Sequence, residues 1–293
     1  MSDSFVRRFL FEGLDIRGAF VHLGDAWAAM QHDRDYQPTV AQLLGETAAV
    51  TALIAAQLKQ PGRLTLQLRG GGPIQLLVMD CNEKLQMRGM ARSNLVVLPA
   101  PVPELLGAHQ GGQLLMSLDL PTARQPYQSY VPMVGDSIAG IFEHYLEQSE
   151  QQPSRLFATA SPRAAVCLFL QKMPDADARD PDGWHRITQL AATVKTAELL
   201  ELEAESLLTR LFHEDIEAHG IRLYDPLPVA YHCPEDWEKV RDMIRGIGRA
   251  DAEAILAEHG EILIRDDICN REYRFTPDDV AALFAASEGR ALN

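Results

Sequence analysis

"RLTLQLRGGGPIQLLVMDCNEKLQMRGMARS", residues 63–93, contains three strand-like runs in close succession. The runs are Leu64–Leu68, Ile74–Met79 and Gln86–Ala91, and short connections rich in Gly or Asn separate them. Connections this short join antiparallel strands, because neighbouring parallel strands need a long crossover. The sequence therefore predicts an antiparallel meander at the centre of the N-terminal half.

The glycine run Gly70–Gly72 joins the first two of these strands. A phosphate-binding loop needs a helix N-terminus directly after its glycines, where free backbone N–H groups point at the anion. Here the apolar run "IQLLVM" follows instead. We therefore interpret the glycines as a tight strand connection, in which glycine supplies the positive φ angles that hairpin turns require.

Helices and further strands are predicted on both sides of the meander. Residues 39–62 have the pattern of a long, largely buried helix ended by Pro61 and Gly62, and Asp136 or Ser137 can cap a second helix. Strand patterns occur at residues 13–23, 113–120, 127–134 and 164–174. The mixture predicts an α+β fold with an N-terminal antiparallel-sheet core and packed helices.

The composition changes after Pro174, which predicts a division into domains. "DADARDPDGWHR" (175–186) is acidic and rich in helix breakers, and leucine stripes then indicate helices over 187–220. A small α+β unit follows, whose last helix has Thr276 as cap, Pro277 at the first position and Asp279 reaching back. We predict an N-terminal core over 1–178, a helical linker over 179–230 and a C-terminal domain over 231–293.

Charge and hydropathy exclude several classes of partner and location. The 293-residue chain has a formal net charge of −14, and such an excess of carboxylates repels nucleic-acid phosphates and anionic lipids. The N-terminus lacks the features of a secretory signal, and no uninterrupted apolar run has the length of a membrane span. We therefore expect a cytoplasmic protein that binds neither nucleic acid nor membrane.

No arrangement of side chains indicates an enzyme. The nine histidines are scattered without the helical spacing of a metal-binding pair, and no serine lies in a nucleophile-elbow motif. We expect no catalytic residues.

The four cysteines divide into two groups. Cys81 and Cys167 lie in apolar strand patterns, where a cysteine usually serves as a small buried hydrophobe. Cys233 and Cys269 instead flank the two ends of the small C-terminal unit. Units of this size have little apolar core, so a metal or a crosslink commonly supports them.

Two interpretations of Cys233 and Cys269 follow from the residues alone. Structural zinc takes four ligands and prefers thiolates, of which only two are available. His232, Glu235 and Asp266 lie beside them and are candidate nitrogen or oxygen ligands, which hold zinc less tightly than sulfur. The residues leave open a zinc site and a pair of structural or redox-active thiols.

Several stretches resemble the bacterial 33-kilodalton redox-regulated heat-shock chaperone family. The most specific block runs from "GDSIA" at 135–139 to "SEQQPSRLF" at 149–157. Together the matches cover essentially the whole chain. The other matching stretches are "RFLFEGLDIRGAFVHL", "LTLQLRGGGPIQLLVMDCNEKLQMRGMAR", "LLTRLFHEDIEAHGIRLYDPLPVAYHC" and "AILAEHGEILI".

The resemblance implies an ATP-independent holdase that binds unfolding or oxidatively damaged client proteins and is a homodimer when active. In the family, the N-terminal core binds clients and dimerises, and a C-terminal redox-switch domain holds zinc through a Cys-x-Cys and a Cys-x-x-Cys pair. Oxidants convert each pair to a disulfide and release the zinc. The switch domain and linker then unfold and expose apolar surface.

This sequence departs from the family pattern at the switch. Cys233 matches the first thiol of Cys-x-Cys, but Glu235 replaces the second. Cys269 matches the last thiol of Cys-x-x-Cys, but Asp266 replaces the first. The two family disulfides therefore cannot form within their motifs, and tight zinc binding is in doubt.

Three expectations for the switch remain after the resemblance is taken into account. In the first, heat or general unfolding of the C-terminal unit controls the holdase without zinc. In the second, Cys233 and Cys269 form one disulfide, which stabilises the unit by roughly 3 to 4 kcal/mol in the chain-entropy model and so locks it. In the third, Cys233, Cys269, His232 and Asp266 bind zinc weakly. We favour the first.

Two functions outside the holdase class compete with it. One is a metal-binding small-molecule enzyme on the same fold, and the other is an inactive interaction scaffold that kept the fold and lost the switch.

Overall fold

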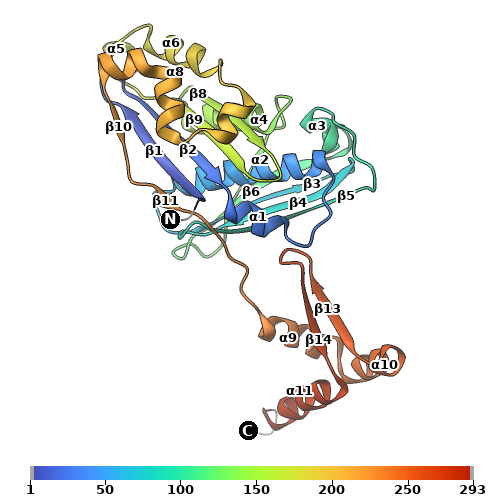
Figure 1. The fold of residues 1–293 in the computed structure, drawn as a ribbon. Coiled ribbons are helices and arrows are strands. Elements are labelled where there is room, and N and C mark those ends of the chain that lie inside the picture. The colour runs from blue at the N-terminus through green and yellow to red at the C-terminus, as the bar shows by residue number, and fades with distance from the viewer. Residues whose placement is uncertain (1–2, 291–293) are drawn as a thin grey trace. The chain divides into compact units, whose positions relative to one another are not determined.

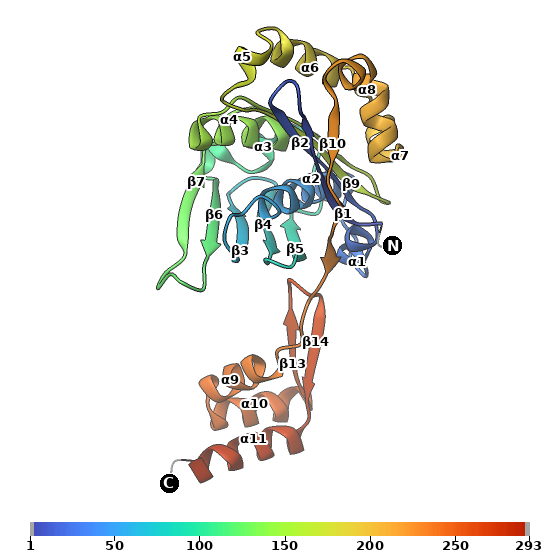
Figure 2. The ribbon, with the colours of Figure 1, turned by 90° about the vertical axis from the view of Figure 1, so that its left-hand side faces the viewer.

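The computed structural model describes residues 3–290, and the chain divides into two compact units between His232 and Cys233. We call the part up to His232 the core unit and the part from Cys233 the terminal unit. The predicted linker, residues 179–230, lies within the core unit. Helices and antiparallel sheets occur in both units, and the predicted α+β class is confirmed (Figures 1 and 2).

One sheet of the core unit, here the first sheet, has the strand order β10-β1-β2-β9-β8, with β11 also paired to β1. All of its pairs are antiparallel. Strand β9 lies between two neighbours and is buried along nearly its whole length, as its continuous apolar run predicts. The strands are β1 (Phe5–Phe11), β2 (Ile16–Leu23), β8 (Ser154–Ala160), β9 (Ala165–Lys172), β10 (Ile221–Leu223) and β11 (Leu227–Pro228).

The second sheet has the order β12-β5-β4-β3-β6-β7 and contains the predicted meander. Its pairs are antiparallel except for β12 and β5, which run parallel. All three strand predictions within residues 63–93 are confirmed. The strands are β3 (Arg63–Arg69), β4 (Ile74–Cys81), β5 (Gln86–Ser93), β6 (Gln113–Asp119), β7 (Tyr127–Val131) and β12 (Ala230–Tyr231).

The glycines between β3 and β4 form the predicted strand connection, but the predicted reason for them is wrong. None of Gly70–Gly72 has a positive φ angle. A Cβ atom on Gly70 would overlap the carbonyl oxygen of Leu106, and one on Gly72 would overlap the backbone of Gly107. These glycines are therefore required because the segment after α3 (Val102–Leu105) passes directly against them.

Helix α2 (Pro38–Ala55) lies between the two sheets and supplies the centre of the main apolar core (Figures 1 and 2). It is the one helix of the described residues that is long and apolar enough to cross a membrane, but 72% of it is buried inside the protein. That burial identifies it as a core helix. Against it pack α1 (Asp25–Gln31) and α4 (Ile138–Glu150), and Ser137 caps α4 by accepting from Gly140 N at 3.1 Å. The 3-10 turn Ala108–Gln110 follows α3.

Four helices after β9 contribute to a second apolar cluster on the opposite face of the first sheet. They are α5 (Ala176–Arg179), α6 (Gly183–Ala191), α7 (Thr196–Glu201) and α8 (Ala204–His219). Part of the acidic stretch predicted as a loop therefore forms helices. The first sheet is thus covered on both faces, by α2 on one and by these helices on the other.

The terminal unit contains two helices, a hairpin and a third helix. Its core is small, with Tyr273, Phe275 and Val280 among its buried residues. The predicted cap of the last helix is confirmed, because Asp279 N donates to Thr276 Oγ1 at 3.3 Å and Thr276 N donates to Asp279 Oδ2 at 2.9 Å. The elements are α9 (Trp237–Ile247), α10 (Arg249–His259), β13 (Ile262–Asp266), β14 (Arg271–Phe275) and α11 (Pro277–Arg290).

A buried carboxyl group on α2 makes the stability of the core unit depend on pH. Burial raises the pKa of Glu46, and a hydrogen bond from Gln42 opposes the shift. Since the folded state then binds more protons than the unfolded state, stability falls as pH rises through the raised pKa. We expect Glu46→Gln to raise Tm at pH 7 by roughly 2 °C, and the gain to vanish below the unfolded pKa.

Thermal melts of wild type and Glu46→Gln between pH 4 and pH 8 check this expectation, with Glu83→Gln on an exposed turn as the control. Equal Tm values at every pH would contradict it.

Candidate functional site

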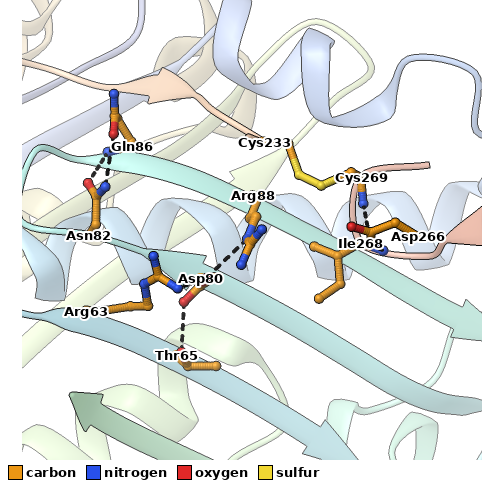
Figure 3. Close-up of polar contacts among 10 residues, drawn as sticks. All are labelled: Arg63, Thr65, Asp80, Asn82, Gln86, Arg88, Cys233, Asp266, Ile268 and Cys269. Atoms are coloured by element: carbon orange, nitrogen blue, oxygen red, sulfur yellow. Dashed lines mark hydrogen bonds and ion pairs between the residues drawn. A yellow bond between two sulfur atoms is a disulfide. The ribbon is translucent and has the colours of Figure 1, made fainter. Parts of the chain in front are cut away.

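The candidate site is the disulfide that joins Cys233 to Cys269 (Figure 3). Cys233 lies just before α9, and Cys269 lies in the turn between β13 and β14. Their Cα atoms are 5.8 Å apart, within the usual range for a disulfide, although 36 positions separate them in the sequence. The fold therefore brings together the two thiols that the sequence leaves far apart, in the arrangement of the second expectation.

Asp266 shapes the turn that carries Cys269. Its Oδ1 accepts hydrogen bonds from Ile268 N at 2.9 Å and from Cys269 N at 3.3 Å (Figure 3). Asn270 then takes a left-handed conformation with φ of 53°, which asparagine tolerates better than most residues. At the position where the family has a cysteine, this chain therefore has a carboxylate that stabilises the local turn.

Glu235, at the other replaced cysteine position, contacts the neighbouring strand. Its Oε2 accepts from Trp237 Nε1 at 2.9 Å, and its Oε1 lies 3.7 Å from Arg271 Nη1 on β14. Nearby, Asp236 N donates to the hydroxyl oxygen of the buried Tyr273 at 3.2 Å. The segment after Cys233 is thus attached to β14 by polar contacts in addition to the disulfide.

The proposed metal ligands are not arranged as a zinc site in this disulfide form. A disulfide sulfur is no longer a thiolate, and Oδ1 of Asp266 already accepts hydrogen bonds from two backbone N–H groups. His232 is exposed at the end of the core unit, where its backbone N–H donates to the carbonyl oxygen of Met87 at 3.0 Å. Among the side chains that the structure describes, up to residue 285, no three His, Cys, Asp or Glu gather as a metal site. Zinc binding by the reduced protein stays a prediction.

The other two thiols are buried in the sheets, as predicted. Cys81 is 1% exposed and Cys167 is fully buried. Burial, aided by the nearby Asp80 carboxylate, raises the pKa of Cys81 to about 12, and burial also raises the pKa of Cys167. Because the thiolate is the reactive form, both cysteines are protected from oxidants in the folded protein.

Arg271, Trp237 and Tyr273 belong to the site but are not predicted as members from the sequence. Arg271 and Tyr273 are two residues apart on β14 and so lie on the same face of the strand: Tyr273 enters the core, and Arg271, at the start of the strand, faces Glu235. Trp237 packs edge-on against Tyr273, with ring centres 4.9 Å apart. The alternating pattern of "REYRF" predicts that positions 271, 273 and 275 share the inner face of the strand, but it does not name their partners.

Figure 3 also shows a separate polar cluster within the second sheet of the core unit. The buried Asp80 accepts from Thr65 Oγ1 at 2.8 Å and from Arg88 Nε at 3.2 Å. Since these residues come from three adjacent strands, the cluster holds the meander in register.

The fold and site together define a two-part α+β protein with a cysteine-containing C-terminal unit. The chain belongs to the family described as "Hsp33 protein", whose model matches residues 4–276. Among curated relatives, the 33 kDa chaperonin of Methylobacillus flagellatus is 39% identical, over 95% of this chain and 94% of that protein. The 33 kDa chaperonin of Azotobacter vinelandii is 38% identical, over 97% of this chain and 96% of that protein.

A solved structure supports the fold. The crystal structure of the 33 kDa chaperonin from Thermotoga maritima has a TM-score of 0.78 and covers 98% of this chain and 99% of its own, at 20% identity. The family resemblance of the sequence is thus confirmed.

We expect the disulfide to stabilise the terminal unit, because it closes a long loop and so restricts the unfolded chain. The chain-entropy model gives about 3 to 4 kcal/mol. Reduction with dithiothreitol is therefore expected to lower the melting temperature of the terminal unit and to leave Cys81 and Cys167 unreactive until the core unit unfolds. Calorimetry and thiol titration measure the two effects, with Cys233→Ser as the permanently reduced control. Equal melting temperatures of the terminal unit in oxidised and reduced protein would show that the disulfide does not stabilise it.

We expect the two carboxylate replacements to be the cause of weak zinc binding. Glu235→Cys/Asp266→Cys restores four thiolates, so the reduced variant should retain about one zinc per chain, whereas reduced wild type should retain far less. Elemental analysis after dialysis measures both, and Asp251→Cys/Glu253→Cys on the exposed face of α10 is the control for added thiols. Near-stoichiometric zinc in reduced wild type would show that the carboxylates are adequate ligands.

Proposed function

We propose that this protein is an ATP-independent holdase chaperone that binds unfolding or oxidatively damaged proteins. Membership of a family whose curated relatives are named 33 kDa chaperonins supports the chaperone class. The structural observation that supports the holdase mechanism is an apolar sheet face covered by two short helices, α6 and α7, and by the interrupted helix α8. A holdase needs such a face, because it needs no catalytic residues but must release apolar surface when clients unfold.

The covered face lies on the first sheet. Phe11 and Leu168 are buried there against Leu208 and Phe212 of α8, and the rings of Phe11 and Phe212 meet edge-on at 5.3 Å. Exposing about 600 Å² of such surface corresponds to on the order of 15 kcal/mol of transfer free energy. Association and ordering costs remove much of that amount, and the remainder is available for binding clients.

The covering helices have features of a marginally stable element. Helices α6 and α7 contain 9 and 6 residues, and helices this short are unstable without tertiary packing. Helix α8 is interrupted at Phe212, whose φ of −131° and ψ of 24° are not helical. We propose that these helices leave the sheet before the rest of the core unit unfolds.

Ion pairs join the covering helices: Arg210 of α8 donates from Nε to Glu198 Oε1 of α7 at 2.5 Å, and a more buried pair links α6 to α8. Arg186 of α6 donates from Nη2 to Asp215 Oδ1 of α8 at 2.7 Å and to Asp180 Oδ2 at 2.9 Å, and Asp215 is 4% exposed. Removal of Asp215 leaves part of the Arg186 charge without its partner. We expect this loss to destabilise the packing of α6–α8 on the first sheet by on the order of 2 kcal/mol.

A second apolar surface is exposed even while the covering helices stay packed on the first sheet. Leu95, Val96 and Leu98 are 96%, 71% and 73% exposed, respectively. The Gln37 side chain fixes this loop, since its amide donates to Leu95 O at 2.7 Å and accepts from Val97 N at 2.8 Å. A loop held this way can contact clients while the covering helices are still in place. The formal net charge of −14 keeps a protein with such exposed apolar side chains soluble.

We propose warming as the trigger, because the replaced zinc ligands remove the basis for zinc release. The Cys233–Cys269 disulfide should then act as a stabilising lock on the terminal unit. Homodimer formation and a cytoplasmic location stay predictions. The metal-dependent enzyme alternative has no support in the arrangement of the described side chains.

We expect Asp215→Ala to activate the protein at a lower temperature, because it weakens the cover without touching the sheet face. Light scattering of a heat-denatured client, without ATP, at a series of temperatures measures the onset of protection. Glu214→Ala, the exposed neighbour on α8, is the matched control and should behave as wild type.

Two results decide the proposal. If wild type fails to suppress aggregation under reducing, oxidising and heated conditions, the holdase function is wrong. If Asp215→Ala protects the client only at the wild-type temperature, the function stands and the covering helices are not the element that opens.

A further inference from the structure

The core unit contains a pocket of about 580 Å³ that the proposed mechanism does not use. One wall comes from strands β1 and β2 at the N-terminus, and the other from the α7–α8 connection and the prolines at 226 and 228. The volume is that of a site for a large side chain or a small ligand.

The floor of the pocket is apolar and partly aromatic. Phe5 stacks on His22 with ring centres 5.9 Å apart and tilts against Phe20 at 6.4 Å. Leu200 and Leu202 face them from the α7–α8 connection. A floor of this kind accepts an aliphatic or aromatic side chain, because it removes that side chain from water.

The rim of the pocket is acidic. It carries four carboxylates and one guanidinium, and that guanidinium, of Arg7, already pairs with Glu205. Glu201 and Glu203 are exposed at the edge and face solvent. An acidic rim around an apolar floor attracts a ligand that is apolar and cationic, and it repels phosphates, nucleotides and fatty acids.

We propose that this pocket binds an extended segment of an unfolding protein in which a large apolar side chain lies next to Lys or Arg. The proposal rests on the proposed holdase function and names the sequence class of its clients. The apolar side chain enters between Phe5 and Leu202, and the cation lies beside Glu201 and Glu203. Since Leu200 and Leu202 belong to the covering segment, the pocket exists only while α7 and α8 are in place, so this contact precedes opening.

The test uses the full-length oxidised protein below its opening temperature. Two fluorescein-labelled peptides serve as probes, one that alternates Leu or Phe with Lys, and one in which each Lys is replaced by Glu. Anisotropy should show binding of the basic peptide and none of the acidic peptide. Glu201→Lys/Glu203→Lys should weaken binding of the basic peptide roughly tenfold, because two surface ion pairs become repulsive.

Two further variants separate this site from general charge attraction. Glu83→Lys/Glu104→Lys makes the same change in net charge elsewhere on the core unit and should bind as wild type. Leu202→Trp fills the pocket and should lose binding while its melting temperature shows that it is folded. Equal weakening by both charge variants, or equal binding of both peptides, would overturn the proposal.

Client protection distinguishes failure of this inference from failure of the holdase function. If wild type suppresses client aggregation and Glu201→Lys/Glu203→Lys suppresses it equally at every temperature, the pocket takes no part and only this inference fails. If wild type does not suppress aggregation at all, the proposed function fails with it.

Discussion

The structure of the core unit depends on burying both faces of the first sheet. Strand β9 is apolar from Ala165 to Leu170, so neither face of the sheet is stable in water. The long helix α2 covers one face and is itself enclosed by the second sheet. The other face depends on α6–α8, which are joined by the pair of Arg186 with the buried Asp215 and by the pair of Arg210 with Glu198. We propose that this second boundary is the weaker of the two.

In the terminal unit, polar contacts and a disulfide lie at the positions that the family resemblance assigns to a zinc-binding switch. Two positions that carry zinc thiolates in the family are carboxylates here, and each has a local partner: Asp266 binds turn N–H groups and Glu235 faces Arg271. The two remaining thiols lie close enough to form a disulfide. These contacts and the disulfide support the small core of the unit, and oxidation is expected to stabilise it rather than to unfold it.

Much of the fold follows from local sequence pattern. The three strands of residues 63–93, helix α2 and the caps at Ser137 and Thr276 are predicted because period, capping residues and turn residues agree. Short strands such as β10–β12 are not predicted, since two or three residues carry no period. The reason for Gly70–Gly72 is also beyond local pattern, because it depends on a segment more than 30 residues later, around Leu106.

The site was less predictable than the fold. Burial of Cys81 and Cys167 follows from their apolar surroundings, but the meeting of Cys233 and Cys269 does not follow from their spacing and was expected only through the family resemblance. The pairing of Glu235 with Arg271 and the pocket beside Phe5 depend on tertiary placement. Leucine stripes predict that α6–α8 are amphipathic, yet they do not identify the sheet as the surface they cover.

Hydrogen–deuterium exchange at the temperature where client capture begins tests the central claim most directly. The account predicts that amides of residues 183–219 lose protection at that temperature while β3, β4 and β5 remain protected. Client capture with α6–α8 still protected would contradict it.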